Sequence, residues 1–231
     1  MPSRAGRAAL SLAVSILTAS AIALLSSIPG ANARTPSPEL DAYRDFVQRP
    51  EARRLLAVAR DAMERYWGGA ASVDSTTAPV WPDAPVGVYL SLVERTGTRA
   101  CVGSAAPIRA GLSETVRALA IESLQADRRR PPIRREEIAS LRIVIAFAGS
   151  GERVADPMDI DPGREGLRIT SGSASMAFLP GEARTVSWAL REAKRVGVLH
   201  GGEDTAEFHR FPVVTLSEPI PPPPTEEPDA P

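Results

Sequence analysis

Lysine, histidine and cysteine are scarce in this sequence. Its 231 residues contain two histidines, one lysine (Lys194) and one cysteine (Cys101). A single cysteine cannot form an internal disulfide, and two histidines with one cysteine do not make a structural zinc site. Motifs for phosphate loops, serine nucleophile elbows and zinc proteases are also absent, so we predict no cofactor and no metal. The Cys101 thiol is therefore buried and inert, reactive, or paired with another molecule.

An excess of positive charge is lacking as well. The sequence has 27 Lys and Arg residues against 28 Asp and Glu residues, a formal net charge of −1. Such a balance provides no field that would draw the chain onto nucleic acid or anionic lipid. Aromatic residues are not interleaved with the arginines, which also argues against nucleic acid as a partner.

The first 33 residues have the pattern of an export signal. Arg4 and Arg7 precede an uncharged run over residues 8–28, and Ala31-Asn32-Ala33 supplies a signal-peptidase motif. We predict that residues 1–33 are cleaved and that the protein is exported, to the periplasm or outside the cell, with no later membrane contact. The alternative is an uncleaved membrane anchor, because the apolar run is longer than an ordinary signal core.

The rest of the chain divides by composition into three segments. Residues 34–48 are a linker or a short helix, and residues 49–217 are long enough to form one domain with its own core. Residues 218–231 are acidic and rich in proline, which predicts a disordered tail. A polyproline ligand for a partner protein is the alternative for this tail.

Hydrophobic periodicity predicts three main helices within the domain. The first starts after Pro50 and ends at Gly68-Gly69, where glycine can terminate a helix. The second starts at Ser113 as its N-cap and ends before Pro131, and the third covers residues 185–197.

Alternating or continuous apolar residues predict the strands of an antiparallel sheet. Residues 86–94 and 99–102 form a hairpin around Gly97, and residues 141–147 are apolar enough for a central strand. Residues 208–216 are a last extended segment, which Pro212 interrupts and so places at a sheet edge. A second predicted hairpin joins residues 166–170 to residues 173–179. The fold class is α/β (α+β-like), an antiparallel sheet with flanking helices.

Five short motifs, in order, resemble the AMMECR-type domain family. They are Arg-Ala-Cys-Val-Gly at 99–103, Asp-Arg-Arg-Arg-Pro-Pro at 127–132, Arg-Arg-Glu-Glu-Ile at 134–138, Gly-Arg-Glu-Gly-Leu-Arg-Ile at 163–169 and Met-Ala-Phe-Leu-Pro at 176–180. The resemblance implies antiparallel strands and flanking helices in two unequal subdomains, with a cleft beside the Arg-x-Cys-x-Gly strand. It implies no defined reaction.

The chain departs from the family pattern at three points. Ala100 replaces the usual glycine of the Arg-Gly-Cys-Ile-Gly signature, which limits how closely the backbone can approach a ligand. Gly181 stands where the family often has glutamate, and Glu182 follows one place later. The family is generally cytosolic, whereas this chain carries an export signal.

Two functional hypotheses follow, and they differ in the role of Cys101. In the first, the cleft binds a small anionic ligand or a protein partner, with Arg99, Gly103, Asp127 and Arg168 as ligand-binding residues. In the second, Cys101 is the catalytic nucleophile of a thiol-dependent enzyme, and Arg99 with a helix N-terminus lowers its pKa. Arg99 and Cys101 are two positions apart, so they share one face of a regular strand. A buried structural cysteine is the simpler reading of Cys101.

Two charged clusters have readings that involve no ligand. The arginines at 128–130, 134 and 135 could receive a phosphate, but acidic neighbours make a self-paired surface the simpler reading. Asp156, Asp159 and Asp161 could suggest calcium, but their spacing lacks the EF-hand pattern and reads as a polar loop.

Overall fold

The computed structural model describes residues 37–68, 81–83, 85–106, 111–125, 127, 129–200 and 203–219. All the described residues belong to one compact unit. The predicted signal, the loop at residues 69–80 and the tail from residue 220 lie outside the described residues. Within the described ranges, no helix is both long and apolar enough to cross a membrane.

The domain contains four α-helices and five short 3₁₀ turns in its described part. The helices are α1 (Asp41–Val47), α2 (Arg53–Tyr66), α3 (Leu112–Ser123) and α4 (Val186–Arg195). The 3₁₀ turns are Pro38–Leu40, Pro50–Ala52, Arg135–Ser140, Pro157–Asp159 and Glu203–Thr205.

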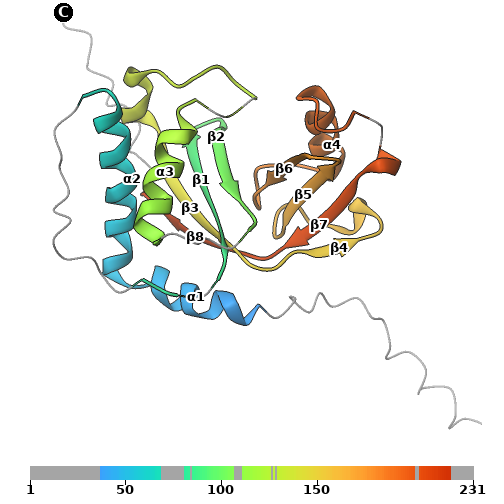
Figure 1. The fold of residues 1–231 in the computed structure, drawn as a ribbon, viewed down its shortest axis with the longest axis horizontal. Coiled ribbons are helices and arrows are strands. Elements are labelled where there is room, and N and C mark those ends of the chain that lie inside the picture. Colours follow the sequence, from blue (N-terminus) through green and yellow to red (C-terminus); the bar gives the residue numbers. More distant parts are fainter. Residues whose placement is uncertain are drawn as a thin grey trace, which may run out of the picture. The chain divides into compact units, whose positions relative to one another are not determined.

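Eight strands form two four-stranded antiparallel sheets (Figure 1). The first sheet has the order β2-β1-β3-β8, and the second has the order β4-β7-β5-β6. The strands are β1 (Gly87–Glu94), β2 (Gly97–Ser104), β3 (Arg142–Ala148), β4 (Glu152–Val154), β5 (Gly166–Ser171), β6 (Ala174–Phe178), β7 (Glu207–Phe211) and β8 (Val213–Ser217). The predicted antiparallel α+β class is confirmed, and the strands fall into two sheets.

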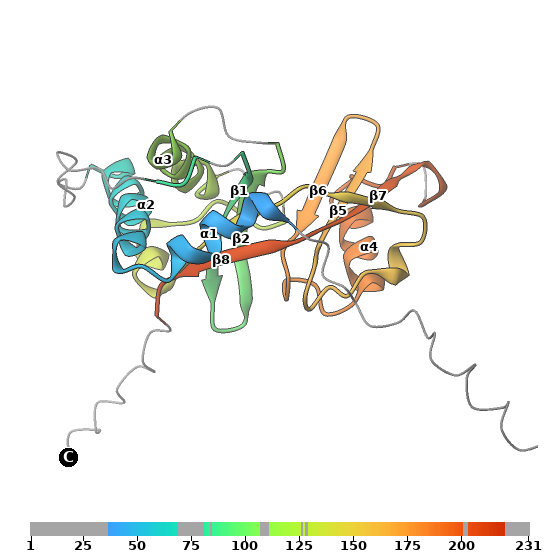
Figure 2. The ribbon, with the colours of Figure 1, turned by 90° about the horizontal axis from the view of Figure 1, so that it is seen from below.

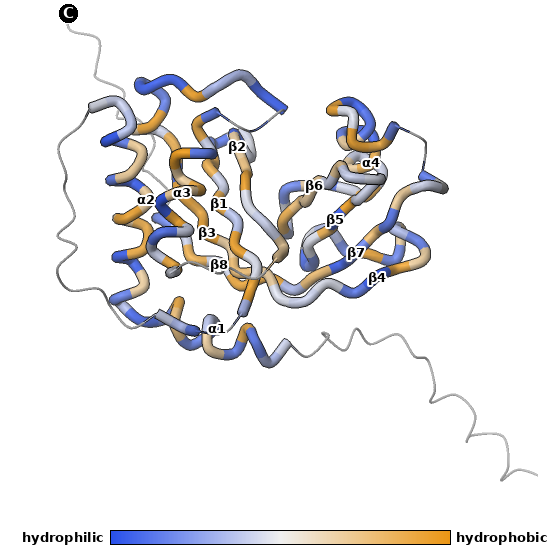
Figure 3. Tube along the Cα trace, in the orientation of Figure 1, coloured by the Kyte–Doolittle hydropathy of each residue, from blue (hydrophilic) through white to orange (hydrophobic). Residues whose placement is uncertain are grey.

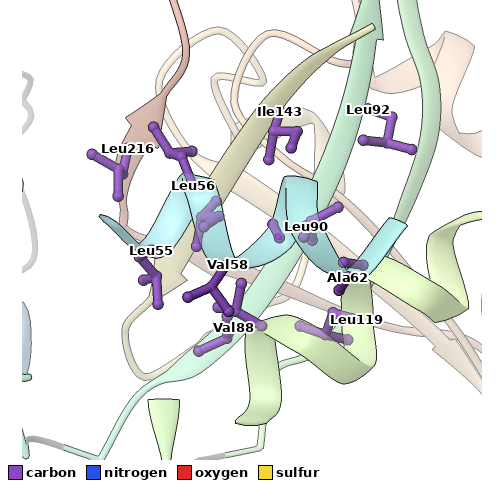
Figure 4. Close-up of a cluster of buried hydrophobic side chains, with 14 of the residues drawn as sticks. Leu55, Leu56, Val58, Ala62, Val88, Leu90, Leu92, Leu119, Ile143 and Leu216 are labelled. Atoms are coloured by element: carbon purple, nitrogen blue, oxygen red, sulfur yellow. The ribbon is translucent and has the colours of Figure 1, made fainter. Parts of the chain in front are cut away.

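Helices α2 and α3 cover one face of the first sheet. Val88, Leu90 and Leu92 alternate along β1 and point into this core, as the period of two predicts. Figure 4 shows them facing Leu55 and Leu119 of the two helices. Orange, apolar stretches of the tube in Figure 3 gather where these helices meet β1 and β3. Strand β3 lies inside its sheet, which confirms the central position predicted from its apolar run.

Helix α4 covers one face of the second sheet. Thr185 accepts a hydrogen bond from the Trp188 N–H and so caps the start of this helix. The buried stripe of α4 packs on Leu167 and Ile169 of β5. Because α4 covers this face only, the side chains on the other face of β5 are left to face the first sheet.

One predicted strand is in fact two strands in different sheets. Residues 208–216 are predicted as an interrupted extended segment at a sheet edge. The structure has two strands there, and only β8 lies at an edge, that of the first sheet, while β7 lies inside the second. Pro212 stands between them, where its missing N–H removes no ladder bond and its carbonyl accepts from the Gly149 N–H at 3.0 Å. Figure 2 shows β7 and β8 as one long path that links the sheets.

The start of α3 also differs from the prediction. Ser113 was expected to cap this helix, but Gly111 is the N-cap residue and the helix begins at Leu112. No side chain caps this end. The Leu112 side chain is buried in the core, and this anchors the first turn two residues earlier than the capping pattern predicts.

Candidate functional site

Two adjoining hollows lie between β2 and the second sheet. The first, here called the Cys101 hollow, has a volume of about 500 Å³ and is lined by residues 101–103 of β2, residues 173–177 at β6, Val196 and Val198. The second, the Arg168 hollow, has a volume of about 520 Å³ and reaches from Gly103 to Arg168 and His209. Tyr89, Gly103 and residues 175–177 line both, so the hollows form one continuous cleft.

Four of the five residues singled out in the sequence line this cleft. Cys101, Gly103 and Asp127 line the Cys101 hollow, and Arg168 lines the Arg168 hollow. Arg99 lines neither of them. The structure therefore brings Cys101 and Arg168 to one cleft and separates both of them from Arg99.

A β-bulge explains why Arg99 and Cys101 do not share a face. The β1–β2 register pairs Leu92 with Ala100 and Val93 with Thr98, which leaves Arg99 without a strand partner. The expectation of a shared face assumed a regular strand and is wrong. The buried Arg99 guanidinium instead donates from Nε to Glu137 Oε2 at 2.9 Å and from Nη2 to the Pro131 carbonyl at 3.1 Å.

Asp127 is hydrogen-bonded to the backbone at the edge of β2. Its Oδ2 accepts a hydrogen bond from the Cys101 N–H at 2.8 Å, and its Oδ1 accepts one from the Arg129 N–H at 2.8 Å. The Arg129 Nη2 also donates to Asp127 Oδ2 at 2.7 Å. These partners hold the pKa of Asp127 below its usual range despite its burial, with Arg129 as the main stabilising neighbour.

Glu182 is a buried carboxylate that the sequence reading noted only as a departure from the family. Its Oε2 accepts from the Leu179 N–H at 2.8 Å, and its Oε1 lies 4.0 Å from Arg129 Nη2. No described residue donates a hydrogen bond to Oε1. Burial raises the pKa of Glu182, and the Arg129 charge only partly opposes that rise.

The Cys101 thiol is not activated in this setting. Burial raises its pKa strongly, and the nearby Glu182 charge raises it further. Ser91 lies opposite Cys101 on β1, and Arg129 gives only a partial counter-effect. The two groups expected to lower this pKa were Arg99 and a helix N-terminus near Ser113. Arg99 is directed to Glu137, and neither group is among the causes that lower the thiol pKa.

Two more arginines of the predicted cluster, Arg130 and Arg134, pair with local acids. Arg130 Nη1 lies 2.7 Å from Glu94 Oε1, and Arg134 Nε lies 3.5 Å from Glu137 Oε1. Arg128 lies outside the described residues. The self-paired reading of this cluster therefore fits the geometry, and no described group of His, Cys, Asp and Glu side chains could hold a metal ion.

Arg168 is placed differently from these arginines. It lies on β5 directly opposite His209 of β7, on the face of the second sheet that α4 does not cover. In the described part of the chain no acidic side chain lies within ion-pair distance of Arg168. Glu207 lines the same hollow, but it pairs with Arg153 at 3.5 Å. Desolvation lowers the pKa of His209, and the neighbouring Arg168 charge lowers it further.

Gly103 fits the crowded wall between the two hollows. Its φ of +154° lies in the region that favours glycine. A Cβ at this position would lie 2.5 Å from Tyr89 Cα and would also overlap the Val88 carbonyl oxygen. Glycine here lets β2 lie directly against the Tyr89 ring, which forms the floor of both hollows.

Comparison with known proteins is consistent with this arrangement of strand, cleft and second sheet. The sequence profile of the AMMECR1 family matches residues 56–213. This chain belongs to the AMMECR1 family. The matched range covers strands β1 to β7, α3 and α4, and it includes every cleft residue described above.

Relatives of this AMMECR1 domain come from bacteria and archaea. A protein of Thermotoga maritima is 28% identical over 130 residues, which cover 55% of this chain and 75% of that protein. A protein of Methanothermobacter thermautotrophicus is 28% identical over 155 residues, which cover 63% and 79% of the two chains. The crystal structure of the uncharacterized protein PH0010 from Pyrococcus horikoshii matches with a TM-score of 0.52 at 24% identity, covering 70% of this chain and 88% of that one. This likeness supports the fold.

Proposed function

We propose that the cleft of this AMMECR1 domain binds an anionic group, carried by a small ligand or by a protein partner, with Arg168 as the receiving cation. The observation that supports this is the uncompensated charge of Arg168 in a hollow whose acid, Glu207, already pairs with Arg153. A guanidinium presents several fixed N–H donors that match carboxylate and phosphate oxygens.

The other residues predicted for this site serve it in a different way. Gly103 shapes the wall, and Asp127 holds the Cys101 segment through a backbone hydrogen bond. Arg99 is bound to Glu137 and to the Pro131 carbonyl, so it ties β2 to the segment at residues 131–137 and does not face the cleft. In this proposal Arg168 makes the ligand contact, while Asp127 and Arg99 are positioning residues.

The test is a thermal shift titration with inorganic phosphate at constant ionic strength, kept constant with chloride. We expect phosphate to raise the melting temperature of the wild-type protein and not that of the Arg168→Gln variant. Arg164→Gln is the matched control, because Arg164 is exposed, pairs with Asp161 and lines neither hollow. Equal shifts in the wild type and in Arg168→Gln would exclude Arg168 as the anion site.

A thiol-dependent enzyme is the second candidate function. Its support is that Cys101 lines the cleft beside the buried Glu182 carboxylate, which could accept the thiol proton once a substrate is bound. The raised thiol pKa makes this the weaker candidate. Iodoacetamide labelling separates the two: a thiol that reacts only after denaturation contradicts the enzyme.

Export of the protein is proposed on the sequence pattern of residues 1–33 alone. N-terminal sequencing of the protein from producing cells tests it. A mature chain that starts near residue 34 is expected, whereas a retained Met1 favours the membrane anchor.

A further inference from the structure

We infer that the Cys101 hollow receives an extended peptide segment, which adds as a strand along the free edges of β2 and β6 and places a carboxylate at Arg168. Part of this inference, the carboxylate contact, rests on the proposed function. The strand addition rests on separate observations, which concern the backbone of the two strands.

The residues that line the Cys101 hollow indicate that it lies against the edges of β2 and β6. Residues line it consecutively, 101 to 103 on β2 and 173 to 177 at β6. A hollow above the face of a sheet meets only alternate residues, because successive side chains point to opposite sides. The Arg168 hollow shows that second pattern, with Arg168 and Thr170 from β5 and Glu207 and His209 from β7. Both β2 and β6 are outer strands of their sheets.

Hydrogen bonding shows which backbone groups point outward on β2. The Cys101 N–H leaves the β1–β2 ladder and donates to Asp127. Because outward and inward groups alternate along an edge strand, Gly103 also directs its N–H and C=O away from β1. Asp127 occupies the edge only at Cys101, and no described residue hydrogen-bonds the Gly103 backbone on that side.

The turn between β5 and β6 gives the corresponding groups on β6. Ser171 and Ala174 close a two-residue hairpin loop in which Gly172 has a φ of +59°. In such a loop the two closing residues hydrogen-bond each other through their backbones, and bonded and non-bonded pairs then alternate along the hairpin. Ser175 and Ala177 therefore belong to pairs without backbone hydrogen bonds to β5. Their N–H and C=O groups therefore point away from β5, toward the hollow, and no described residue engages them.

The side chains of this edge leave the backbone accessible. Residues 173–177 are Ser, Ala, Ser, Met and Ala, without the proline or lysine that commonly protects an exposed strand edge. Val196 and Val198 line the same hollow and can contact apolar side chains of an added strand. The volume of about 500 Å³ is within the range of ligand-binding clefts.

An unrelated peptide suits this edge better than the chain's own tail. The tail is acidic, but residues 221–224 are four consecutive prolines, which have no N–H for a strand ladder. A peptide free of proline can use its N–H and C=O groups on both sides, and one acidic residue can reach Arg168 through the shared wall of the two hollows.

The test uses a pool of capped hexapeptides with random Ser, Thr, Val and Ala positions and one terminal Asp. Amide hydrogen exchange of the full protein is followed with and without this pool. We expect slower exchange at Gly103, Ser175 and Ala177 in its presence. A second pool, N-methylated at alternate amides, should bind at least about tenfold more weakly because it lacks the main-chain donors.

Two protein variants separate edge pairing from loss of folding. Ser175→Pro removes the outward N–H of β6 and should abolish the exchange protection, while Ser175→Ala keeps that N–H and should retain it. If Ser175→Pro fails to fold, the two peptide pools on the wild-type protein still compare binding with and without main-chain hydrogen bonds.

Each outcome decides the inference independently of the proposed function. A phosphate shift that depends on Arg168, without peptide protection at millimolar pool, overturns strand addition and leaves anion binding in place. Protection that is unchanged in Arg168→Gln supports strand addition and removes the carboxylate contact. Protection that appears without peptide and grows with protein concentration overturns the inference in favour of self-association.

Discussion

The two sides of the cleft handle charge in opposite ways. On the β2 side the two charged residues of the family motifs are paired nearby: Arg99 binds Glu137, and Asp127 binds Arg129. On the side of the second sheet, Arg168 has no described acidic partner while its neighbour Glu207 is already paired. The motif that identifies the family thus builds a closed structural network, and the open charge comes from another motif. A signature residue need not be the residue that contacts a ligand.

The largest effect should follow from breaking the closed side at Asp127. Asp127→Ala leaves Arg129 buried without its carboxylate and the Cys101 N–H without an acceptor. Loss of one partner of a buried pair costs about 3–5 kcal/mol of unfolding free energy, or roughly 6–20 °C in melting temperature. Thermal or urea unfolding measures this, with the exposed Asp159→Ala as control. A change as small as that of the control would show that the network is not needed for stability.

The next effect concerns the wall that joins the two sides. Gly103→Ala forces a Cβ against Tyr89 and the Val88 carbonyl, and it adds strain at positive φ. We expect a loss of about 2–3 kcal/mol in unfolding free energy. Gly97→Ala is the matched control, because Gly97 also has positive φ but nothing lies within 4 Å of its added Cβ. Equal losses in both variants would mean that backbone strain alone matters at Gly103.

A smaller, pH-dependent effect is expected at Glu182. Its pKa is raised in the folded state, so the folded protein holds the Glu182 proton more tightly than the unfolded chain does. The resulting contribution to folding stability is fully present below the usual pKa of about 4.5 and is lost as pH rises through the raised pKa. Glu182→Gln imitates the neutral form. It should therefore gain stability relative to the wild type between pH 4.5 and pH 7.5, measured by urea unfolding.

The same variant also tests the link to Cys101. Removing the Glu182 charge should lower the pKa of the thiol, because this charge contributes to raising it. Faster iodoacetamide labelling at a fixed alkaline pH is the expected result. Unchanged labelling, together with a flat difference in stability across pH, would contradict the placement of a charged Glu182 beside the thiol.

Much of the fold could be predicted from local patterns in the sequence. Alternating apolar residues located β1, and the apolar run at residues 141–147 identified β3 as an inner strand. The division into two sheets could not be predicted, because strand pairing depends on contacts between residues far apart in the chain. Pro212 predicts an edge position for residues 208–216, but it lies between two strands of different sheets, and only β8 is at an edge.

The candidate site could be predicted only in part, for two physical reasons. A β-bulge adds one residue without a sequence signal, and it leaves Arg99 without a strand partner and directed to Glu137. Burial of a charged residue depends on the completed fold, so Glu182 and the unpaired state of Arg168 were invisible in the sequence. The motif match did identify Cys101, Gly103, Asp127 and Arg168, which line one cleft in the structure. Their role in that cleft stays a prediction.

The smallest expected effect is a shift in the titration of His209, and it addresses the open side of the cleft directly. Desolvation and the Arg168 charge hold the folded-state pKa of His209 below its usual value of about 6.5. As pH falls below that value, the unfolded chain takes up the proton first, so the folded state loses stability. Arg168→Gln should move the His209 pKa upward without restoring it fully, because desolvation is the larger cause.

Proton NMR of the imidazole resonances measures this shift, with the His209→Gln variant to assign the signal. In the wild type, phosphate bound at Arg168 should also raise the His209 pKa, because the anion stabilises the imidazolium. In Arg168→Gln the same phosphate should have no effect. If phosphate raises the His209 pKa equally in both proteins, the anion binds without Arg168, and the contrast between the closed and the open side of the cleft no longer holds.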